Sequence, residues 1–234
     1  MQVNIVGVSG SPRKGATQYC VQEALRSASE ILGISTHFID LRGNKINHCI
    51  HCNRCLHEKL DICPVFEDDM SGYYDYILKA DGIVLGSPVY HMSPSSLMQA
   101  FLNRLRPLGR YIGSGGWAVK VGGAIAVGGM RNGGQETTLE CLNNFFFCSG
   151  MVVVSGGIFA YNGGSIWSND KKEIGAKEDT IGMDTVRVIG RRTAIIAKLL
   201  KLGLTQAAGI EPSVLAGLSG PSELEQKLDK FRHR

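Results

Sequence analysis

The stretch VNIVGVSGSPRKGAT, residues Val3 to Thr17, decides the fold. Its first part, Val3–Val8, is apolar and rich in valine and isoleucine, which predicts a buried strand. A loop of glycine, serine and basic residues then leads into a helix-like segment, Thr17–Leu32. A strand that passes through a loop into a helix is the repeating unit of a parallel α/β sheet. The start of such a helix offers free backbone N–H groups to an anion.

The loop carries the donors that a phosphate monoester needs. Ser9, Ser11 and Thr17 supply hydroxyl groups, and Arg13 and Lys14 supply positive charge. Together with the helix start, these residues predict a phosphate cradle. The alternative is a plain polar turn between strand and helix, because serine is common where helices begin.

A nucleoside triphosphate or a dinucleotide is a poor match to this loop. Gly10 and Gly15 have the spacing of a Walker A loop, but Ala16 and Thr17 stand where lysine and then serine or threonine should follow. The dinucleotide fingerprint G-x-G-x-x-G is absent as well. A single terminal phosphate, as in FMN, fits better, and Ala16 is then counted among the cofactor-binding residues.

Strand-like and helix-like segments alternate along the chain. This alternation predicts a parallel sheet covered on both faces. Five strands at this spacing predict a flavodoxin-like, doubly wound fold with strand order 2-1-3-4-5. The further strands are expected at Thr36–Leu41, Gly82–Leu85, Gly123–Val127 and Met151–Val154. The further helices are expected at Asp68–Ala80, Ser95–Leu108, Gln135–Cys148 and Thr185–Leu202.

Three segments fall outside this pattern. Residues 47–66 form a cysteine-rich insertion after the second strand. Asn162–Asp184 is polar and bears glycine, and we expect it to be a long ordered loop. We predict that residues 1–203 form the FMN-binding domain, and that residues 204–234 are a C-terminal extension that contacts a partner subunit.

Two more loops follow the third and fourth strands, at the carboxyl edge where doubly wound sheets bind ligands. They are GSPVYHMSPSS, Gly86–Ser96, and VGGMRNGGQET, Val127–Thr137. The first offers stiff, apolar surface to a ring, and the second offers backbone N–H groups and polar donors. The cofactor-binding residues expected in them are Ser87, Pro88, Val89, Tyr90, Met92, Gly129, Met130, Arg131, Asn132, Gly133 and Gly134.

Four of the seven cysteines lie in one short stretch, CIHCNRCLHEKLDIC, Cys49–Cys63. Their spacing is C-x2-C-x2-C-x7-C, and the first three match the ferredoxin run whose thiolates hold one [4Fe–4S] cluster. The longer last spacer lets the fourth cysteine return to the same cluster. The predicted ligands of a [4Fe–4S] cluster are Cys49, Cys52, Cys55 and Cys63.

Structural zinc is the main alternative for these thiolates, and a disulfide is a remote one. Zinc sites use paired C-x2-C knuckles with a longer spacer between them, whereas this run is three plus one. His48, His51 and His57 flank the thiolates and are residues of a type that binds zinc, but we expect them to be solvated or hydrogen-bonding neighbours. The spacing favours the cluster. The other cysteines are expected to be small buried hydrophobic residues. They are Cys20, Cys141 and Cys148.

Composition excludes several classes of protein. The 234 residues are 44% hydrophobic and 20% charged, as in one globular domain. The formal net charge is only +4, so we expect no nucleic-acid partner. The chain starts without a signal-peptide pattern, and no apolar run reaches the roughly 18 residues of a membrane span. A cytoplasmic protein with no membrane partner is predicted, and in that compartment clustered cysteines favour metal over disulfides.

The loops GSPRKGAT, GSPVYHMSPS and GGMRNGGQET resemble the FMN-binding loops of the NAD(P)H-dependent FMN reductase superfamily. With the cysteine stretch, the resemblance narrows to the iron–sulfur flavoproteins of anaerobic microbes, chiefly methanogenic archaea. It covers residues 1 to about 200, although the first loop is one residue shorter before Thr17 than the commoner form. It implies dimers paired into tetramers, with the cluster of one subunit near the FMN of another. It also implies ferredoxin as electron partner and dioxygen or peroxide reduction as an outlet.

The sequence therefore predicts a redox flavoprotein that passes electrons between a [4Fe–4S] cluster and FMN, and it leaves open whether the protein turns over as an enzyme. No acid–base catalyst is expected, and Tyr90 and His91 are expected to pack beside the flavin, with a proton relay as the alternative role. Two other functions stay open. One is an NAD(P)H-dependent reductase of flavin, quinones or nitro compounds with structural zinc, and the other is a redox sensor. Arg187, Arg191 and Arg192 either face solvent or dock an acidic ferredoxin.

Overall fold

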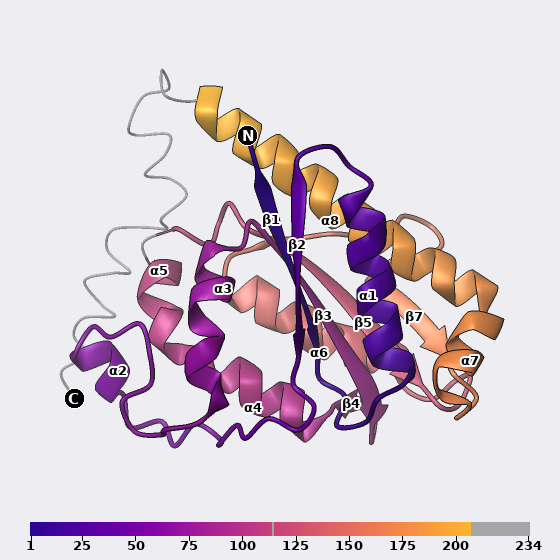
Figure 1. Ribbon diagram of the computed structural model, residues 1–234, viewed down its shortest axis with the longest axis horizontal. Helices are drawn as coiled ribbons and strands as arrows, with labels where there is room; N and C mark the ends of the chain where they lie inside the picture. Colours follow the sequence, from indigo (N-terminus) through magenta and orange to yellow (C-terminus); the bar gives the residue numbers. More distant parts are fainter. Residues whose placement is uncertain (114, 207–234) are drawn as a thin grey trace.

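The computed structural model describes residues 1–113 and 115–206, and it has a twisted sheet with helices on both faces (Figure 1). The strands are β1 Val3–Ser9, β2 Ile34–Asp40, β3 Gly82–Tyr90, β4 Ser93–Pro94, β5 Val121–Gly128, β6 Val152–Val153 and β7 Gly164–Trp167. Six of them are parallel: five lie in the order β2-β1-β3-β5-β6, and β7 also pairs with β5. The predicted order 2-1-3-4-5 is confirmed, because β5 and β6 are the fourth and fifth predicted strands.

Two short strands share the fifth position of the sheet. β6 pairs with the first two residues of β5, and β7 pairs with the last four. The prediction that Asn162–Asp184 is one long loop is wrong, because the segment contains β7, helix α7 (Lys172–Glu178) and the start of helix α8 (Thr180–Gln206). A four-residue strand carries too little alternation to stand out in the sequence.

The helices divide between the two faces of the sheet. They are α1 Ala16–Ser29, α2 Arg54–His57, α3 Tyr74–Lys79, α4 Ser96–Arg104, α5 Gly109–Gly113, α6 Gln135–Cys148, α7 and α8, with 3-10 turns η1 Asp69–Gly72 and η2 Arg106–Leu108. Side chains of α3, α4 and α6 pack on one face, and those of α1, α7 and α8 pack on the other. The helix predicted at Gln135–Cys148 is α6 with the same bounds, whereas the one predicted at Asp68–Ala80 is divided into η1 and α3.

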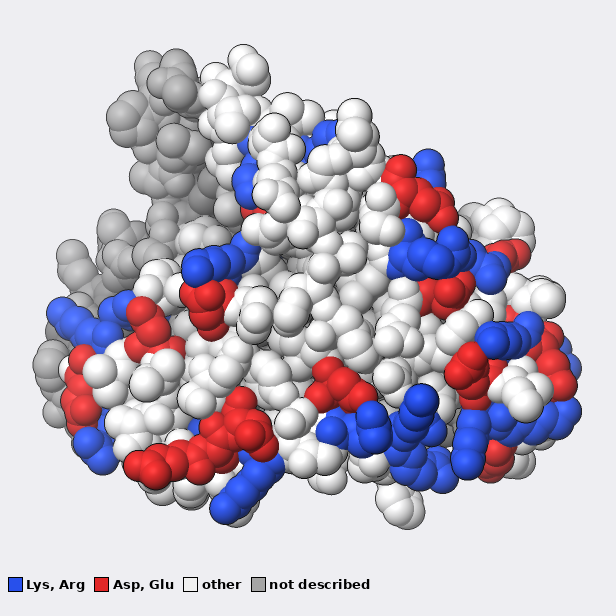
Figure 2. Space-filling model, viewed as in Figure 1, with Lys and Arg blue, Asp and Glu red and all other residues white. Residues whose placement is uncertain are grey.

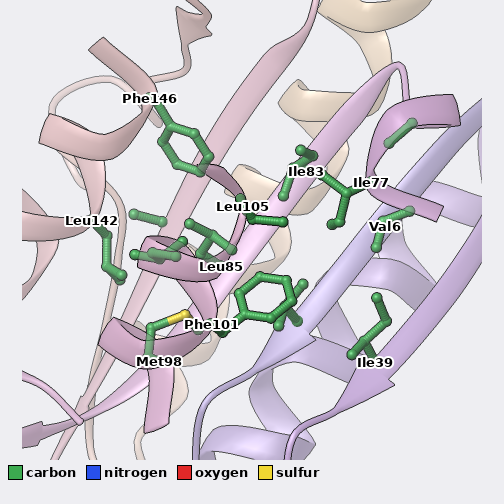
Figure 3. Close-up of a cluster of buried hydrophobic side chains, with 14 of the residues drawn as sticks. Val6, Ile39, Ile77, Ile83, Leu85, Met98, Phe101, Leu105, Leu142 and Phe146 are labelled. Atoms are coloured by element: carbon green, nitrogen blue, oxygen red, sulfur yellow. The ribbon is translucent and has the colours of Figure 1, made fainter. Parts of the chain in front are cut away.

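The core lies directly above and below the central strands. On one face, Val6, Ile39 and Leu85 from three adjacent strands meet Phe101 of α4 and Phe146 of α6 (Figure 3). Burial of such side chains contributes roughly 1.5–3 kcal/mol each to folding. This packing occupies both faces of the sheet, so the carboxyl ends of the strands and the loops that follow them are left to form a site.

Charges of both signs are spread over the face drawn in Figure 2. Lys and Arg side chains gather at its lower edge, where Figure 1 has the loop from β1 to α1. No helix within residues 1–113 and 115–206 combines the length and the apolar character that crossing a membrane requires.

Helix α8 continues to Gln206 and therefore crosses the predicted boundary between residues 203 and 204. The rest of the predicted C-terminal extension, residues 207–234, lies outside the described residues. Its contact with a partner subunit stays a prediction.

Candidate functional site

The loop between β1 and α1 has the backbone of an anion site. Gly15 caps α1 without a side-chain hydrogen bond, and no acidic residue lies in the first turn. The first N–H groups of the helix have no acceptor within it, and they favour a negative group. Thr17 is buried in this turn, while Arg13 and Lys14 are exposed beside it.

Two serines shape this loop. Ser11 Oγ accepts from Arg13 N at 3.2 Å and donates to Arg13 O at 2.7 Å, which closes a tight turn. Ser9 Oγ is buried and has no hydrogen-bond partner among the described residues. An unpaired buried hydroxyl costs about 1–3 kcal/mol, so it is a group that a bound ligand can satisfy.

The loop after β3 is tied to the loop after β1. Gly10 N donates to Gly86 O at 2.8 Å, and Ser95 Oγ donates to Gly10 O at 2.5 Å. Ser87 Oγ accepts from Ser95 N at 2.9 Å. These bonds fix the two loops relative to each other before any ligand binds.

The loop after β5 is held by the side chain of Gln135. Its Oε1 accepts from Gly133 N at 2.9 Å, and its Nε2 donates to Met130 O at 2.7 Å. Gly134 has a φ of 99°, and a Cβ there would lie 2.8 Å from Met92 Cγ. Only glycine suits this position, where the loops after β3 and β5 meet.

A fourth loop, between β7 and α7, lies beside these three, and sequence reasoning missed it. Ser168 N donates to Gly128 O at 2.8 Å, and Trp167 Nε1 donates to Gly129 O at 3.0 Å. The signal that could have found it is the run Ser-Asn-Asp after the apolar pair Ile166 and Trp167, because such turn residues often follow a strand.

The backbone of this fourth loop is strained. Asn169, Asp170 and Lys172 have φ angles of 48°, 53° and 58°. Left-handed residues other than glycine cost of order 1–3 kcal/mol in the less favourable cases, and they gather at ligand sites. The Asp170 carboxylate lies over Gly129, where a Cβ would be 2.6 Å from Oδ1.

The four loops line one pocket at the carboxyl edge of the sheet, here called the strand-end pocket. Its lining residues are Ser11, Arg13, Lys14, Gly15, Ala16, Thr17, Pro88, Val89, Tyr90, Val127, Gly129, Ser168, Asp170 and Lys172. Three of these side chains are basic and one is acidic, and the free end of α1 adds further positive potential. The pocket fits a cofactor with one phosphate and a flat ring, because it combines cationic side chains with the apolar side chains of Pro88, Val89 and Val127.

The remaining predicted cofactor residues lie outside this lining. Ser9 and Ser87 are fully buried. Met92 and Met130 are exposed to solvent, by 56% and 71%. Arg131 lines a neighbouring hollow together with Phe159 and Trp167. The others are Asn132, which is exposed, and Gly133 and Gly134, which are half-buried.

The cysteine-rich segment borders a second cavity, against the end of α4 and η2, here called the cysteine cavity. The four predicted cluster ligands all line it. Its lining residues are Cys49, Ile50, Cys52, Asn53, Cys55, Cys63, Pro64, Val65, Phe66, Arg104, Arg106 and Pro107. Cys55 lies on α2, and Asn53 before that helix has a left-handed backbone with φ of 59°. The fold therefore brings together the four thiols that the spacing singled out.

A buried ion pair anchors this segment. Arg104 Nη1 and Nη2 lie 2.7 and 3.0 Å from the two carboxylate oxygens of Asp68, and Nη1 also donates to Asn47 O at 2.9 Å. Burial would raise the pKa of Asp68, but hydrogen bonds from Arg104 and Asn47 outweigh it and lower that pKa to about 2. Because residues 47 and 68 flank the cysteines, the pair fastens both ends of the segment to α4.

The four thiols that line the cysteine cavity form no disulfide. Within the described part of the chain, no three His, Cys, Asp or Glu side chains form a group that could hold a metal ion. Burial raises the pKa of the Cys55 thiol, the neighbouring Cys63 raises it further, and Arg106 lowers it. His48, His51 and His57 are exposed and do not line the cavity.

The other three cysteines differ in exposure. Cys20 is buried, and burial raises the pKa of its thiol, which makes it unreactive. Cys141 is half-buried. Cys148 is exposed at the end of α6, so the expectation that it is buried is wrong. A seven-residue spacing places Cys141 and Cys148 on the same side of the helix, but the sequence does not say which part of that side is covered.

A match to a protein-family model shows the family of this chain. The model of NADPH-dependent FMN reductases matches residues 3–165, from β1 to β7, including the first three loops of the strand-end pocket. The chain belongs to the NADPH-dependent FMN reductase family. Membership of this family indicates FMN-dependent electron transfer on a flavodoxin-like fold.

Several iron–sulfur flavoproteins are similar in sequence to this chain over most of their length. One from Methanocaldococcus jannaschii is 41% identical over 203 residues, which are 85% of this chain and 100% of the relative. One from Archaeoglobus fulgidus is 42% identical and spans 81% of this chain and 95% of its own. One from Methanosarcina thermophila is 34% identical and spans 85% and 97%. The resemblance to the iron–sulfur flavoproteins is confirmed.

Solved structures with low sequence identity to this chain share its fold. RosB with a bound intermediate matches with a TM-score of 0.64 and 17% identity, over 88% of this chain and 86% of that one. A flavodoxin, WrbA-like protein from Agrobacterium tumefaciens matches with a TM-score of 0.56 and 21% identity, over 85% and 99%. The flavodoxin-like fold is confirmed.

Proposed function

We propose that this protein is an electron-transfer iron–sulfur flavoprotein that passes electrons between a [4Fe–4S] cluster and FMN. The observation that carries the proposal is the cysteine cavity, whose side chains able to bind a metal are four cysteines and no His, Asp or Glu among the described residues. The proposed ligands are Cys49, Cys52, Cys55 and Cys63.

A [4Fe–4S] cluster suits this cavity better than a structural zinc ion. Zinc needs ligands that converge on one point, with Zn–S distances of about 2.3 Å. A cluster has its thiolates at the four corners of a cube, so they stand farther apart. All four cysteines line one cavity, and their run of three plus one differs from the paired C-x2-C knuckles of zinc sites, which favours the cluster.

FMN is proposed to bind in the strand-end pocket. The N–H groups at the start of α1, the Thr17 hydroxyl, Arg13, Lys14 and Lys172 would hold its phosphate. Val89, Tyr90 and the backbone at Gly129 would contact the ring. A cluster transfers electrons singly, and a flavin transfers them singly or in pairs, so the two together exchange electrons between one-electron and two-electron partners.

The proposed electron partners are ferredoxin as donor and dioxygen or peroxide as acceptor. On α8, two of the three arginines expected to face an acidic partner are already paired with carboxylates of this chain. Arg187 lies 2.9 Å from Asp184, and Arg191 lies 3.4 Å from Glu30. We therefore do not assign ferredoxin docking to this helix. A cytoplasmic location is part of the same proposal.

The protein is proposed to form homo-oligomers, dimers or tetramers, with transfer between subunits. The cysteine cavity and the strand-end pocket have no lining residue in common, and Figure 1 has α2 and the β1–α1 loop well apart. Between β6 and β7, Ile158, Phe159 and Tyr161 are 72 to 80% exposed, and large apolar side chains on a surface often mark subunit contacts.

The deciding experiment is to measure iron, acid-labile sulfide, zinc and FMN in protein purified without air. We expect about four iron, four sulfide and one FMN per chain, because one [4Fe–4S] cluster and one flavin account for them. One zinc per chain without sulfide would reject the cluster and leave the flavin site standing.

A second candidate is an NAD(P)H-dependent reductase of flavin, quinones or nitro compounds. It is favoured by a match to an NAD(P)H dehydrogenase (quinone) of Acidithiobacillus ferrooxidans, 36% identical over 90 residues, although these are only 37% of this chain and 38% of that enzyme. Rapid bleaching of the FMN absorbance by NADPH in cluster-free protein would support it. No bleaching by NADPH, but bleaching by reduced ferredoxin, would reject it in favour of the first proposal.

A further inference from the structure

Arg106 is a cation without a counter-ion at the wall of the cysteine cavity. Its Nε and Nη2 donate to Oδ1 of Asn53 at 2.9 and 2.5 Å, and Asn53 is a neutral amide. The neighbouring arginines differ, because Arg104 pairs with Asp68 and Arg110 pairs with Asp61. Among the described residues, no carboxylate forms such a pair with Arg106.

Arg106 places its charge beside the thiols. Its side chain lines the cavity together with all four cysteines. Its hydrogen-bond partner Asn53 stands between two of the proposed ligands, Cys52 and Cys55. Arg106 is half-buried, so water screens its charge less than that of an exposed arginine.

The same charge would act on a cluster in this cavity. A [4Fe–4S] core with four thiolates is negative, and one added electron makes it more negative. A nearby cation therefore stabilises the reduced state more than the oxidised state, which raises the reduction potential. The charge of Arg104 is offset by Asp68, so the larger effect is expected from Arg106.

We propose that Arg106 raises the reduction potential of the cluster through its uncompensated positive charge, and that its bond to Asn53 is a secondary tether of the cysteine loop. This inference rests on the proposed function. It makes Arg106 a positioning and tuning residue that is not itself a ligand. Arg106 then has two roles, a positive charge near the cluster and a hydrogen bond that tethers the cysteine loop. Different variants remove each role separately.

The test compares four variants purified without air. Arg106→Gln removes the charge, and Arg106→Lys keeps it while losing the guanidinium fork. Asn53→Gly removes the tether and keeps the charge, and glycine tolerates the left-handed backbone at this position. Arg192→Gln is the control for the loss of an arginine charge elsewhere, because this exposed arginine lies on α8, which packs on the other face of the sheet. The measurements are iron and sulfide content, then the cluster potential from a redox titration followed by EPR.

We expect Arg106→Gln to shift the potential downward, while Arg106→Lys, Asn53→Gly and Arg192→Gln stay close to the unchanged protein. A potential that does not move in Arg106→Gln overturns the inference. Equal loss of cluster in Arg106→Gln and Asn53→Gly would also overturn it, because Arg106 would then be a tether alone. An unchanged protein without iron and sulfide would instead overturn the proposed function, and this inference with it.

Discussion

Ser95 Oγ lies 2.5 Å from the carbonyl oxygen of Gly10, so the hydroxyl group that begins α4 also holds the loop after β1. Ser95 Oγ also accepts a hydrogen bond from Met98 N at 3.1 Å, which caps the start of α4. The other end of this nine-residue helix is Arg104, at the wall of the cysteine cavity. The helix is roughly 14 Å long, so α4 links the two candidate cofactor sites as a rigid element.

Ser95→Ala is expected to lower the free energy of unfolding by about 1–2 kcal/mol, because it removes a buried helix cap together with the tie to Gly10. FMN affinity should fall, because the loop after β1 is released. Iron content should not change, because the far end of α4 keeps its ion pair. Urea unfolding, flavin titration and iron analysis check these outcomes, with the exposed Ser29→Ala as control. Full FMN affinity in Ser95→Ala would contradict the link.

Cys52→Ala is expected to abolish the cluster and leave FMN binding largely intact, since the cysteine cavity and the strand-end pocket have no lining residue in common. Iron, sulfide and FMN analysis of the purified variant measures both. Cys148→Ser is the matched control, because this thiol is exposed and does not line the cavity. If iron and sulfide survived the loss of Cys52, the ligand assignment would be wrong.

Thr17→Val is expected to weaken FMN binding by roughly tenfold to a hundredfold, the cost of one hydrogen bond to a charged group. The shape of the side chain is kept, and only the hydroxyl is lost. Riboflavin, which has no phosphate, should bind the variant as well as it binds the unchanged protein. Fluorescence titration with both flavins measures the difference. An equal loss for both would mean that Thr17 does not contact the phosphate.

Gly190→Ala is expected to destabilise the protein by about 1–3 kcal/mol, because a Cβ at this position of α8 would lie 2.1 Å from Ala24 O of α1. The two helices would have to move apart. Gly203→Ala, in the same helix with nothing near its Cβ, should instead stabilise it by about 0.5–1 kcal/mol. Urea unfolding measures both changes. A similar effect of the two substitutions would show that α1 and α8 do not pack this closely.

The ion pair of Asp68 and Arg104 is expected to make stability fall in acid. The pKa of Asp68 is lowered from 3.8 to about 2, so its contribution is present above about pH 4 and is lost as the pH falls toward about 2. The shift corresponds to about 2 kcal/mol. Unfolding measured across this range should show the stability difference between the unchanged protein and Asp68→Asn shrinking as the pH falls. A difference that does not depend on pH would contradict the assignment.

Much of this protein follows from its sequence. Local chemistry determines the phosphate loop, because strand, glycine, hydroxyl groups and helix start are contiguous between Val3 and Thr17. The cysteine spacing likewise limits which metal centres the run can hold, because short spacers restrict where thiolates can point. The alternation of strands and helices determines that the sheet is parallel, because parallel strands need crossover connections.

Tertiary structure alone decided what depends on residues far apart in the chain. The loop after β7 lines the strand-end pocket because β7 pairs with the end of β5, in the same position of the sheet where β6 pairs with its start. A strand of four residues has no periodic pattern by which the sequence could reveal this pairing. The exposure of Cys148 depends on which neighbours cover the end of α6. The ion pair of Asp68 with Arg104 and the bond of Arg106 to Asn53 join segments 36 and 53 residues apart, so only the packing of α4 and η2 against the cysteine segment brings those charges to the thiols.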